Sequence, residues 1–255
     1  MVQASFSAKS ALLAQQDRLN VIANNISNND TTAFKSTRVD FKDTLYNTIK
    51  RTEEMENGAN LQRGSGVRIG ATALSMEQGV TQVTGQPLDF CINGSGFFTL
   101  QAADGSKVYT RDGAFAVSNV SGTRYLVNAQ GLYVLDKSGN RISLPAGTNA
   151  EELSCSENGE LTLDGKSFAT LGINEFANPG GLEAVGGNCF KVTDASGAAK
   201  AVSTPSVQQS ALESSNVDMA LEMTRLIRAQ KAFSFAARAL STADEMDAQA
   251  NNLRT

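Results

Sequence analysis

The chain has 255 residues, 41 % hydrophobic residues and a formal net charge of −4, so it can hold one large domain or two modest ones. The negative charge argues against nucleic acid as a partner, because nucleic-acid-binding proteins usually carry a basic surface. The sequence contains no histidine, which excludes Ser-His-Asp and Cys-His catalytic sites and removes the commonest transition-metal ligand.

Glycine and proline are confined to the middle of the chain. All 22 glycines lie between Gly58 and Gly197, and all four prolines lie between Pro87 and Pro205. Because these residues most disfavour a helix interior, the pattern predicts two terminal helices around a β-rich middle. The predicted fold class is α+β, with N- and C-terminal helices that pair as a coiled coil around a mainly antiparallel β body.

The N-terminal segment has the spacing of a helix that packs against another helix. One heptad seam contains the apolar residues Ala8, Leu12, Leu19, Ile22 and Ile26. Gln15 takes the remaining position of the seam, and an amphipathic helix on a globular core explains the pattern equally well. The helix is expected to end within residues 24–30, where clustered Asn, Ser and Asp favour turns.

The middle of the chain divides into a connector and a β body. Residues 50–70 are expected to be an extended or flexible connector, because acidic residues there precede several glycines. Residues 76–205 contain short alternating runs broken by Asp-Gly or Gln-Gly, which is the sequence signal of β-hairpins. The predicted strand pairs are 97–100 with 107–111, 125–127 with 132–135, and 161–163 with 168–171.

The C-terminal segment carries a longer helical seam. Its members are spaced by three and four residues in alternation: Leu226, Ala229, Phe233, Ala236, Leu240 and Ala243. Ser215 is expected to cap this helix, with Asp218 three positions later near the positive end of the helix dipole. Glu222 is expected to pair with Arg225 one turn further on.

No motif predicts a reaction, so we expect no enzyme, no catalytic residue, no metal site, no cofactor and no small-molecule substrate. Cys91, Cys155 and Cys189 match no metal or redox spacing, and free buried thiols are the favoured interpretation, with a disulfide left open. The string Gly165-Lys166-Ser167 is similar to part of a phosphate loop. It leads into a predicted strand instead of the helix that a phosphate loop requires, which favours a hairpin.

Three separated strings resemble one family. They are Leu19–Ile26 with Thr31–Lys35, then Pro87–Asp89 with Tyr109–Gly113, then Leu212–Asp218 with Gln230–Phe233 and Ala250–Leu253. Their content and order resemble the bacterial flagellar rod and hook proteins over nearly the whole chain. The chain departs from the family at Asp30, Ala33 and Ser210, where the family usually has Asn, Gly and Gly.

The resemblance implies a structural axial subunit that polymerises helically into the flagellar rod, forming a drive shaft and a protein-export channel between basal body and hook. Residues 1–35 and 212–255 would form the inner helical domain, residues 36–75 the connector, and residues 76–205 the β-rich outer domain. The length resembles the distal-rod type, with the proximal-rod type as an alternative. A second alternative is an extracellular β-domain that serves as a binding module or enzyme.

The resemblance also implies partners and a location. The expected partners are other copies of the chain, other rod and hook proteins, surrounding ring proteins and the type III export apparatus. The location is the flagellar basal body, reached without a cleaved signal peptide. Ends that are unfolded before assembly would order on joining the polymer.

The expected site residues fall into two groups. The expected subunit-interface residues are Leu12, Leu19, Ile22, Ile26, Leu226, Phe233 and Leu240. The expected residues of the turn that directs the connector are Asn24, Asn25, Phe34 and Lys35.

Overall fold

A computed structural model describes residues 2–50, 61–120, 122–145, 153–163 and 165–252 of the chain. The chain forms two compact units. The terminal unit contains Met1–Ser27, Thr37–Leu74 and Asp218–Thr255, and the body unit contains Asn28–Ser36 and Ser75–Val217. The fold is α+β, as the sequence predicts, with one helix near each end of the chain and antiparallel strands between them.

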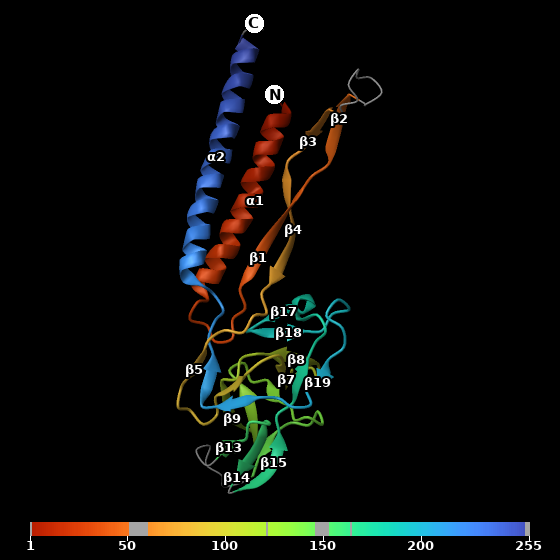
Figure 1. The fold of residues 1–255 in the computed structure, drawn as a ribbon, viewed down its shortest axis with the longest axis vertical. Helices are drawn as coiled ribbons and strands as arrows, with labels where there is room; N and C mark the ends of the chain where they lie inside the picture. The colour runs from red at the N-terminus through yellow and green to blue at the C-terminus, as the bar shows by residue number, and fades with distance from the viewer. Residues whose placement is uncertain (1, 51–60, 121, 146–152, 164, 253–255) are drawn as a thin grey trace. The chain divides into compact units, whose positions relative to one another are not determined.

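Two antiparallel helices dominate the terminal unit. Helix α1 (Val2–Ser27) and helix α2 (Met219–Asn252) pack side by side and run in opposite directions, as Figure 1 shows. Ala229 and Ala243 are buried on α2, and such small residues let two helices approach closely. The coiled-coil geometry that the two seams suggest remains a prediction.

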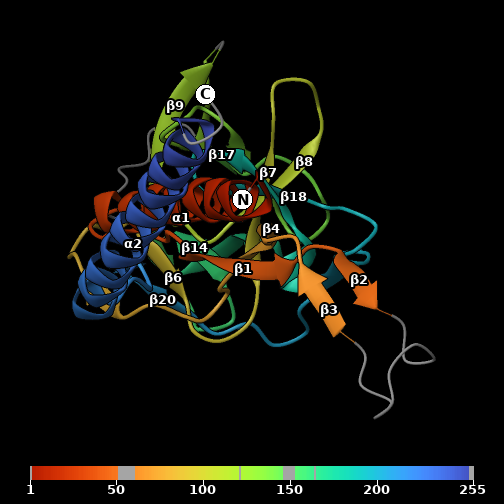
Figure 2. The same cartoon turned by 90° about the horizontal axis from the view of Figure 1, so that it is seen from above.

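A two-part β ribbon completes the terminal unit. Strand β1 (Thr37–Asp43) pairs with β4 (Val67–Leu74), and β2 (Tyr46–Lys50) pairs with β3 (Leu61–Gly64). In Figure 1, α1 lies between α2 and the β1–β4 pair, and Figure 2 shows the same unit from above. Much of the expected connector is therefore paired β structure, while residues 51–60 of it lie outside the described residues.

The ends of the helices correct one prediction. Helix α1 ends at Ser27, inside the expected range. Helix α2 begins at Met219, and the backbone N–H of Leu221 donates to Asp218 Oδ1 at 3.1 Å. Asp218 is therefore the capping residue, and the expectation that Ser215 caps the helix is wrong, because Ser215 lies a full turn too early. Its hydroxyl instead accepts from the N–H of Val217.

Short antiparallel strands build the body unit. One sheet has ten strands, with β12-β10-β11-β7-β8-β18-β17 in order and β9, β16 and β19 at its sides. Their bounds are β7 Phe97–Gln101, β8 Lys107–Thr110, β9 Phe115–Val120, β10 Thr123–Asn128, β11 Tyr133–Val134, β12 Ser143–Leu144, β16 Ile173–Glu175, β17 Glu183–Gly186, β18 Cys189–Lys191 and β19 Lys200–Ala201. A short 3-10 helix covers Pro179–Gly181.

Smaller sheets close the body unit. They are β13 (Leu153–Cys155) with β14 (Glu160–Leu163) and β15 (Lys166–Thr170), β6 (Phe90–Ile92) with β20 (Val207–Gln209), and β5 (Thr81–Val83) with β21 (Ala211–Glu213). The three predicted hairpins are confirmed as the pairs β7–β8, β10–β11 and β14–β15. Lys166 and Ser167 lie in strand β15, so the phosphate-loop interpretation fails on local structure.

The core of the body unit is aromatic and aliphatic. Phe90, Phe98 and Leu100 are fully buried, and Phe98 packs edge-on against Phe115 with ring centroids 5.2 Å apart. Burial of one such side chain stabilises a fold by roughly 1.5–3 kcal/mol. Ten of the sixteen aromatic residues lie between residues 71 and 205, which places the larger core of the chain in this unit.

Candidate functional site

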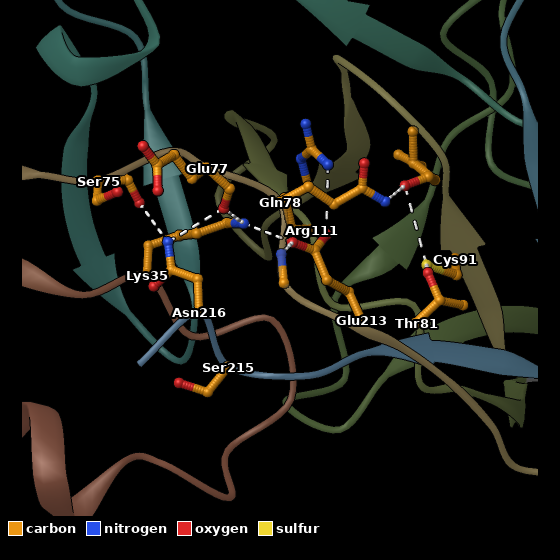
Figure 3. Close-up of polar contacts among 12 residues, drawn as sticks. Lys35, Ser75, Glu77, Gln78, Thr81, Cys91, Arg111, Glu213, Ser215 and Asn216 are labelled. Carbon is orange, nitrogen blue, oxygen red and sulfur yellow. Dashed lines mark hydrogen bonds and ion pairs between the residues drawn. The ribbon is translucent and has the colours of Figure 1, made fainter. Parts of the chain in front are cut away.

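A buried charge cluster lies in the body unit, where three distant parts of the chain meet (Figure 3). We use the name charge cluster for Lys35, Arg111 and Glu213. Lys35 Nζ lies 2.5 Å from Glu213 Oε1, and Arg111 Nη1 lies 3.3 Å from Glu213 Oε2. The three side chains are 5 % exposed or less, so the ion pairs lie in a water-poor environment.

Two cations share one carboxylate in the charge cluster. Burial lowers the pKa of the Lys35 ammonium group, and the neighbouring Glu213 carboxylate opposes that shift. The Arg111 guanidinium also stacks over the Phe97 ring at 5.2 Å, and its Nε has no hydrogen-bond partner among the described residues. Because a lone buried charge costs several kcal/mol, Glu213 is the group that makes this arrangement possible.

Two further hydrogen bonds join the charge cluster to the backbone of Glu77 and Gly79. Lys35 Nζ also donates to the carbonyl oxygen of Glu77 at 2.7 Å, and the N–H of Gly79 donates to Glu213 Oε1 at 2.9 Å. A side chain at position 79 would collide with the carbonyl oxygen of Ser214, so the close approach requires glycine.

Asn216 adds a second set of bonds at the same place. Its Oδ1 accepts from the N–H of Ser36 at 2.7 Å, and its Nδ2 donates to the carbonyl oxygen of Ser75 at 2.9 Å. Ser36, Ser75 and Asn216 all lie next to positions where the chain passes from the body unit into the terminal unit. The polar network therefore closes the body unit at the exits of the chain.

Residues 28–36 are bound to the rest of the body unit. The N–H of Ala33 donates to the carbonyl oxygen of Glu213 at 2.8 Å, and Asn188 Nδ2 donates to the carbonyl oxygen of Thr32 at 2.7 Å. Thr32 Oγ1 donates to Asp112 Oδ1 at 3.2 Å, and burial raises the pKa of Asp112. These bonds hold the turn that precedes Lys35 in one conformation.

The side chain of Asn25 binds the backbone at the start of β1 inside the terminal unit. Its side chain is 1 % exposed, its Oδ1 accepts from the N–H of Thr37 at 3.0 Å, and its Nδ2 donates to the carbonyl oxygen of Thr37 at 2.8 Å. The two bonds mimic a pair of sheet bonds and fix the start of β1 against the end of α1.

Replacing Asn25 with alanine is expected to leave both Thr37 groups without a partner. An unsatisfied buried backbone group costs about 1–3 kcal/mol, which corresponds to about a five- to 150-fold change in an equilibrium. In cells that produce tagged wild-type and Asn25→Ala chains together, the variant's share of the purified assembly should fall by that factor. Asn20→Ala, at an exposed position earlier on α1, is the matched control, and equal shares for Asn25→Ala and wild type would contradict the assignment.

Two positions where the family resemblance leads us to expect glycine have a left-handed backbone in this chain. Ala33 has φ +55° and Ser210 has φ +59°. A residue with a side chain pays about 1–2 kcal/mol for this conformation. The departures from the family therefore leave the turn geometry in the left-handed region, although glycine would adopt it at lower cost.

Replacing Ser210 with glycine is expected to stabilise the body unit. The substitution relieves the strain of the left-handed backbone, but glycine also raises the entropy of the unfolded chain. The free energy of unfolding should therefore rise by up to about 1 kcal/mol. Urea unfolding of the full chain, followed by tyrosine fluorescence, measures it. Ser210→Ala keeps the strained side chain and serves as control, so a Ser210→Gly midpoint at or below that of Ser210→Ala would disprove the strain argument.

The structure places the predicted site residues in different surroundings. Among the predicted interface residues on α1 and α2, Ile22 is buried at 4 % exposure and the others are partly exposed. Of the predicted turn residues, Asn25 belongs to the terminal unit, while Phe34 and Lys35 belong to the body unit. Asn24 is exposed. Their roles in assembly remain predictions.

Sequence reasoning did not find Arg111, Glu213 and Asn216 as a site. Arg111 and Glu213 stand inside the family-like strings, which was the only signal available. Glu213 lies 178 positions from Lys35 and 102 from Arg111, and no local pattern joins residues that far apart.

The chemistry of the site is structural. The carboxylate of Glu213 is occupied by two cations and a backbone N–H. The three cysteines are free thiols: Cys91 and Cys189 are buried as expected, whereas Cys155 is partly exposed. Burial raises the pKa of Cys155 to about 12, so its thiol stays protonated at neutral pH. Among the described residues no group of acidic, cysteine or histidine side chains could hold a metal ion, and no helix could span a membrane.

Comparison with protein-family profiles matches three segments of the chain. Residues 7–35 match the family described as flagella basal body rod protein. Residues 91–163 match the flagellar hook protein FlgE/F/G D1 domain, and residues 208–253 match the flagellar basal body rod FlgEFG protein C-terminal domain. The first and last segments contain most of the two helices, and the middle segment lies in the body unit.

Full-length relatives give the same result. The flagellar basal-body rod protein FlgG of Agrobacterium fabrum is 39 % identical over 94 % of this chain and 94 % of its own length. FlgG of Borreliella burgdorferi is 36 % identical over 100 % of this chain and 99 % of its own length. A flagellar hook-basal body complex protein of Bacillus subtilis, FlhP, is 28 % identical, with each chain covered completely.

Proposed function

The chain belongs to the flagellar basal-body rod protein family, and we propose from this membership that it is a FlgG-type structural subunit of the distal rod. The observation that carries the proposal is the match to rod proteins named FlgG along essentially the whole of both chains. The proximal-rod type shares the FlgE/F/G domains and is the second candidate, but the full-length relatives compared above give it less support.

Exposed apolar residues on the helices support self-assembly. On α2, Met223, Ile227 and Phe235 are 44 %, 53 % and 67 % exposed, and on α1 Phe6 and Leu13 are 63 % and 54 % exposed. Residues of this size gain free energy when a neighbouring subunit covers them. When one face of a subunit binds a different face of the next subunit, and the rotation between them does not close a ring, the subunits form a helical filament. This is the geometry that a rod requires.

The two units suit a division of labour during assembly. The body unit has a large core and a closed charge cluster, whereas the terminal unit has two helices and a ribbon with exposed apolar residues. We propose that the helices order only when neighbouring copies cover them, which limits growth to the tip. Export through the flagellar type III apparatus, and contacts with surrounding ring proteins, belong to the same proposal.

Deletion of the gene tests the function. The deletion strain should lack complete rods and hooks in electron micrographs of purified basal bodies, and it should be non-motile. A plasmid copy of the wild-type gene should restore both. Complete rods and hooks in the deletion strain would exclude the distal-rod role, and a rod that stops earlier than the distal segment would favour the proximal-rod type.

A further inference from the structure

A small cationic pocket lies in the terminal unit where α1, β1 and α2 meet. Its volume is about 200 Å³, and its lining includes Arg18, Arg38, Arg225 and Glu222. Three guanidinium groups and one carboxylate therefore surround one space, with Ile22 in its wall.

The described carboxylates near this pocket pair with two of its three arginines and leave the third without a carboxylate. Glu222 pairs with Arg225 at 2.5 Å, and Arg38 pairs with Asp40 at 3.5 Å on the surface. Arg18 stacks over the Phe41 ring at 5.6 Å and has no carboxylate partner among the described residues. The pocket keeps one excess positive charge, and the side chain of Arg38 is 70 % exposed and held by a surface ion pair.

One carboxylate oxygen in the pocket would accept a hydrogen bond from a guest, whereas the arginines would bind an anion. Glu222 is 3 % exposed, and its Oε2 has no hydrogen-bond partner in the described part of the chain. A guest that fits this pocket therefore carries carboxylates for the arginines and an N–H donor for Glu222.

The last part of α2 has this composition. Asp244, Glu245 and Asp247 lie within four positions there, and Gln249 adds an amide donor. None of the three carboxylates forms an ion pair within the residues that the structure covers. The earlier part of α2 carries the opposite charge, with Arg225, Arg228, Lys231 and Arg238.

The two ends of α2 cannot meet within one subunit. Arg225 and Glu245 lie on one continuous helix, and a rise of 1.5 Å per residue separates them by roughly 30 Å. A second copy can have the same orientation and be shifted by about that distance along the helix axis. Its pocket then lies at the acidic end of α2 of the first copy.

We propose that the pocket receives the acidic end of α2 from a second copy of this chain, which sets the axial register of the polymer. The inference rests on the proposed function, since it requires copies stacked along their helices. Each contact joins unlike ends, so it gives the stack a direction and leaves an acidic end free for the next copy.

Charge reversal tests the proposal in cells that produce wild-type and variant chains together. Arg38→Glu, and separately Glu245→Arg, should each lower the variant's share of the purified rods by about five- to tenfold, because each places like charges together. In cells that produce only the doubly reversed chain, rods should return to nearly wild-type number, because opposite charges meet again. Lys231→Glu, an exposed reversal in the middle of α2, is the matched control and should change the share less than twofold.

The outcomes separate the two proposals. If the wild-type chain restores rods in the deletion strain but single reversals enter as well as wild type, the pocket contact is disproved and the rod function stands. If single reversals fail and the double reversal fails too, the pairing of these two ends is disproved. If the wild-type chain itself does not restore rods, both proposals fall.

Discussion

Replacing Glu213 with glutamine is expected to destabilise the body unit by about 3–5 kcal/mol, the usual cost of removing one partner from a buried ion pair. The substitution leaves Lys35 and Arg111 buried, 5 % exposed or less, without a carboxylate between them. Glutamine can still accept one hydrogen bond from Lys35 or Gly79, but its amide nitrogen then faces a guanidinium. Urea unfolding of the full chain, followed by tyrosine fluorescence, measures the loss.

Two further variants separate charge from packing in this prediction. Glu77→Gln makes the same chemical change at an exposed carboxylate, and the unfolding midpoint should stay near that of wild type. Lys35→Met removes one of the two cations and leaves a balanced Arg111–Glu213 pair, so its loss should be smaller than that of Glu213→Gln. Equal midpoints for Glu213→Gln and Glu77→Gln would refute the role of the charge cluster.

Replacing Ile22 with aspartate is expected to abolish incorporation into the rod. Ile22 is 4 % exposed in the terminal unit and lines the pocket formed by α1, β1 and α2. Aspartate at this position would lose the apolar packing of isoleucine and would compete with Glu222 for the arginines that line the pocket. Purified basal bodies should contain no detectable variant, and a strain that relies on it should be non-motile.

The body unit should not respond to this change. Ile22 belongs to the terminal unit, and three of the four tyrosines, Tyr109, Tyr125 and Tyr133, report on the body unit. The urea midpoint of Ile22→Asp should therefore equal that of wild type. Ile22→Val costs about 0.5–1.5 kcal/mol and should still assemble. Normal rods built from Ile22→Asp would disprove the proposal that the side of α1 carrying Ile22 is needed for assembly.

The helices and hairpins of this chain were visible in its sequence because their causes are local. The absence of glycine and proline from both ends predicts α1 and α2, and the dipeptides Asp104-Gly105 and Gln130-Gly131 predict two hairpin turns. Ser215 predicts a start of α2 that is one turn too early, because Ser215 and Asp218 are both good capping residues and only the structure shows which one is used.

The ribbon and the charge cluster were not predicted. In β1 the alternation of Arg38, Val39, Asp40 and Phe41 is a strand signal, but the acidic and glycine-containing stretch that follows favoured a connector. The charge cluster joins residues 102 and 178 positions apart. Lysine, arginine and glutamate are usually exposed, and only the fold brings these three residues together. Propensity and spacing therefore do not indicate the charge cluster.

We propose that a self-sufficient body unit carries terminal helices that order only in the polymer. Limited proteolysis of the purified full-length monomer, with fragment masses, tests it most directly. We expect residues 75–217, with residues 28–36 still bound to them, to survive while residues 1–27 and 218–255 are digested. If both ends resist digestion in the monomer, the helices are already packed before assembly, and a self-contained function of the folded chain becomes the better explanation.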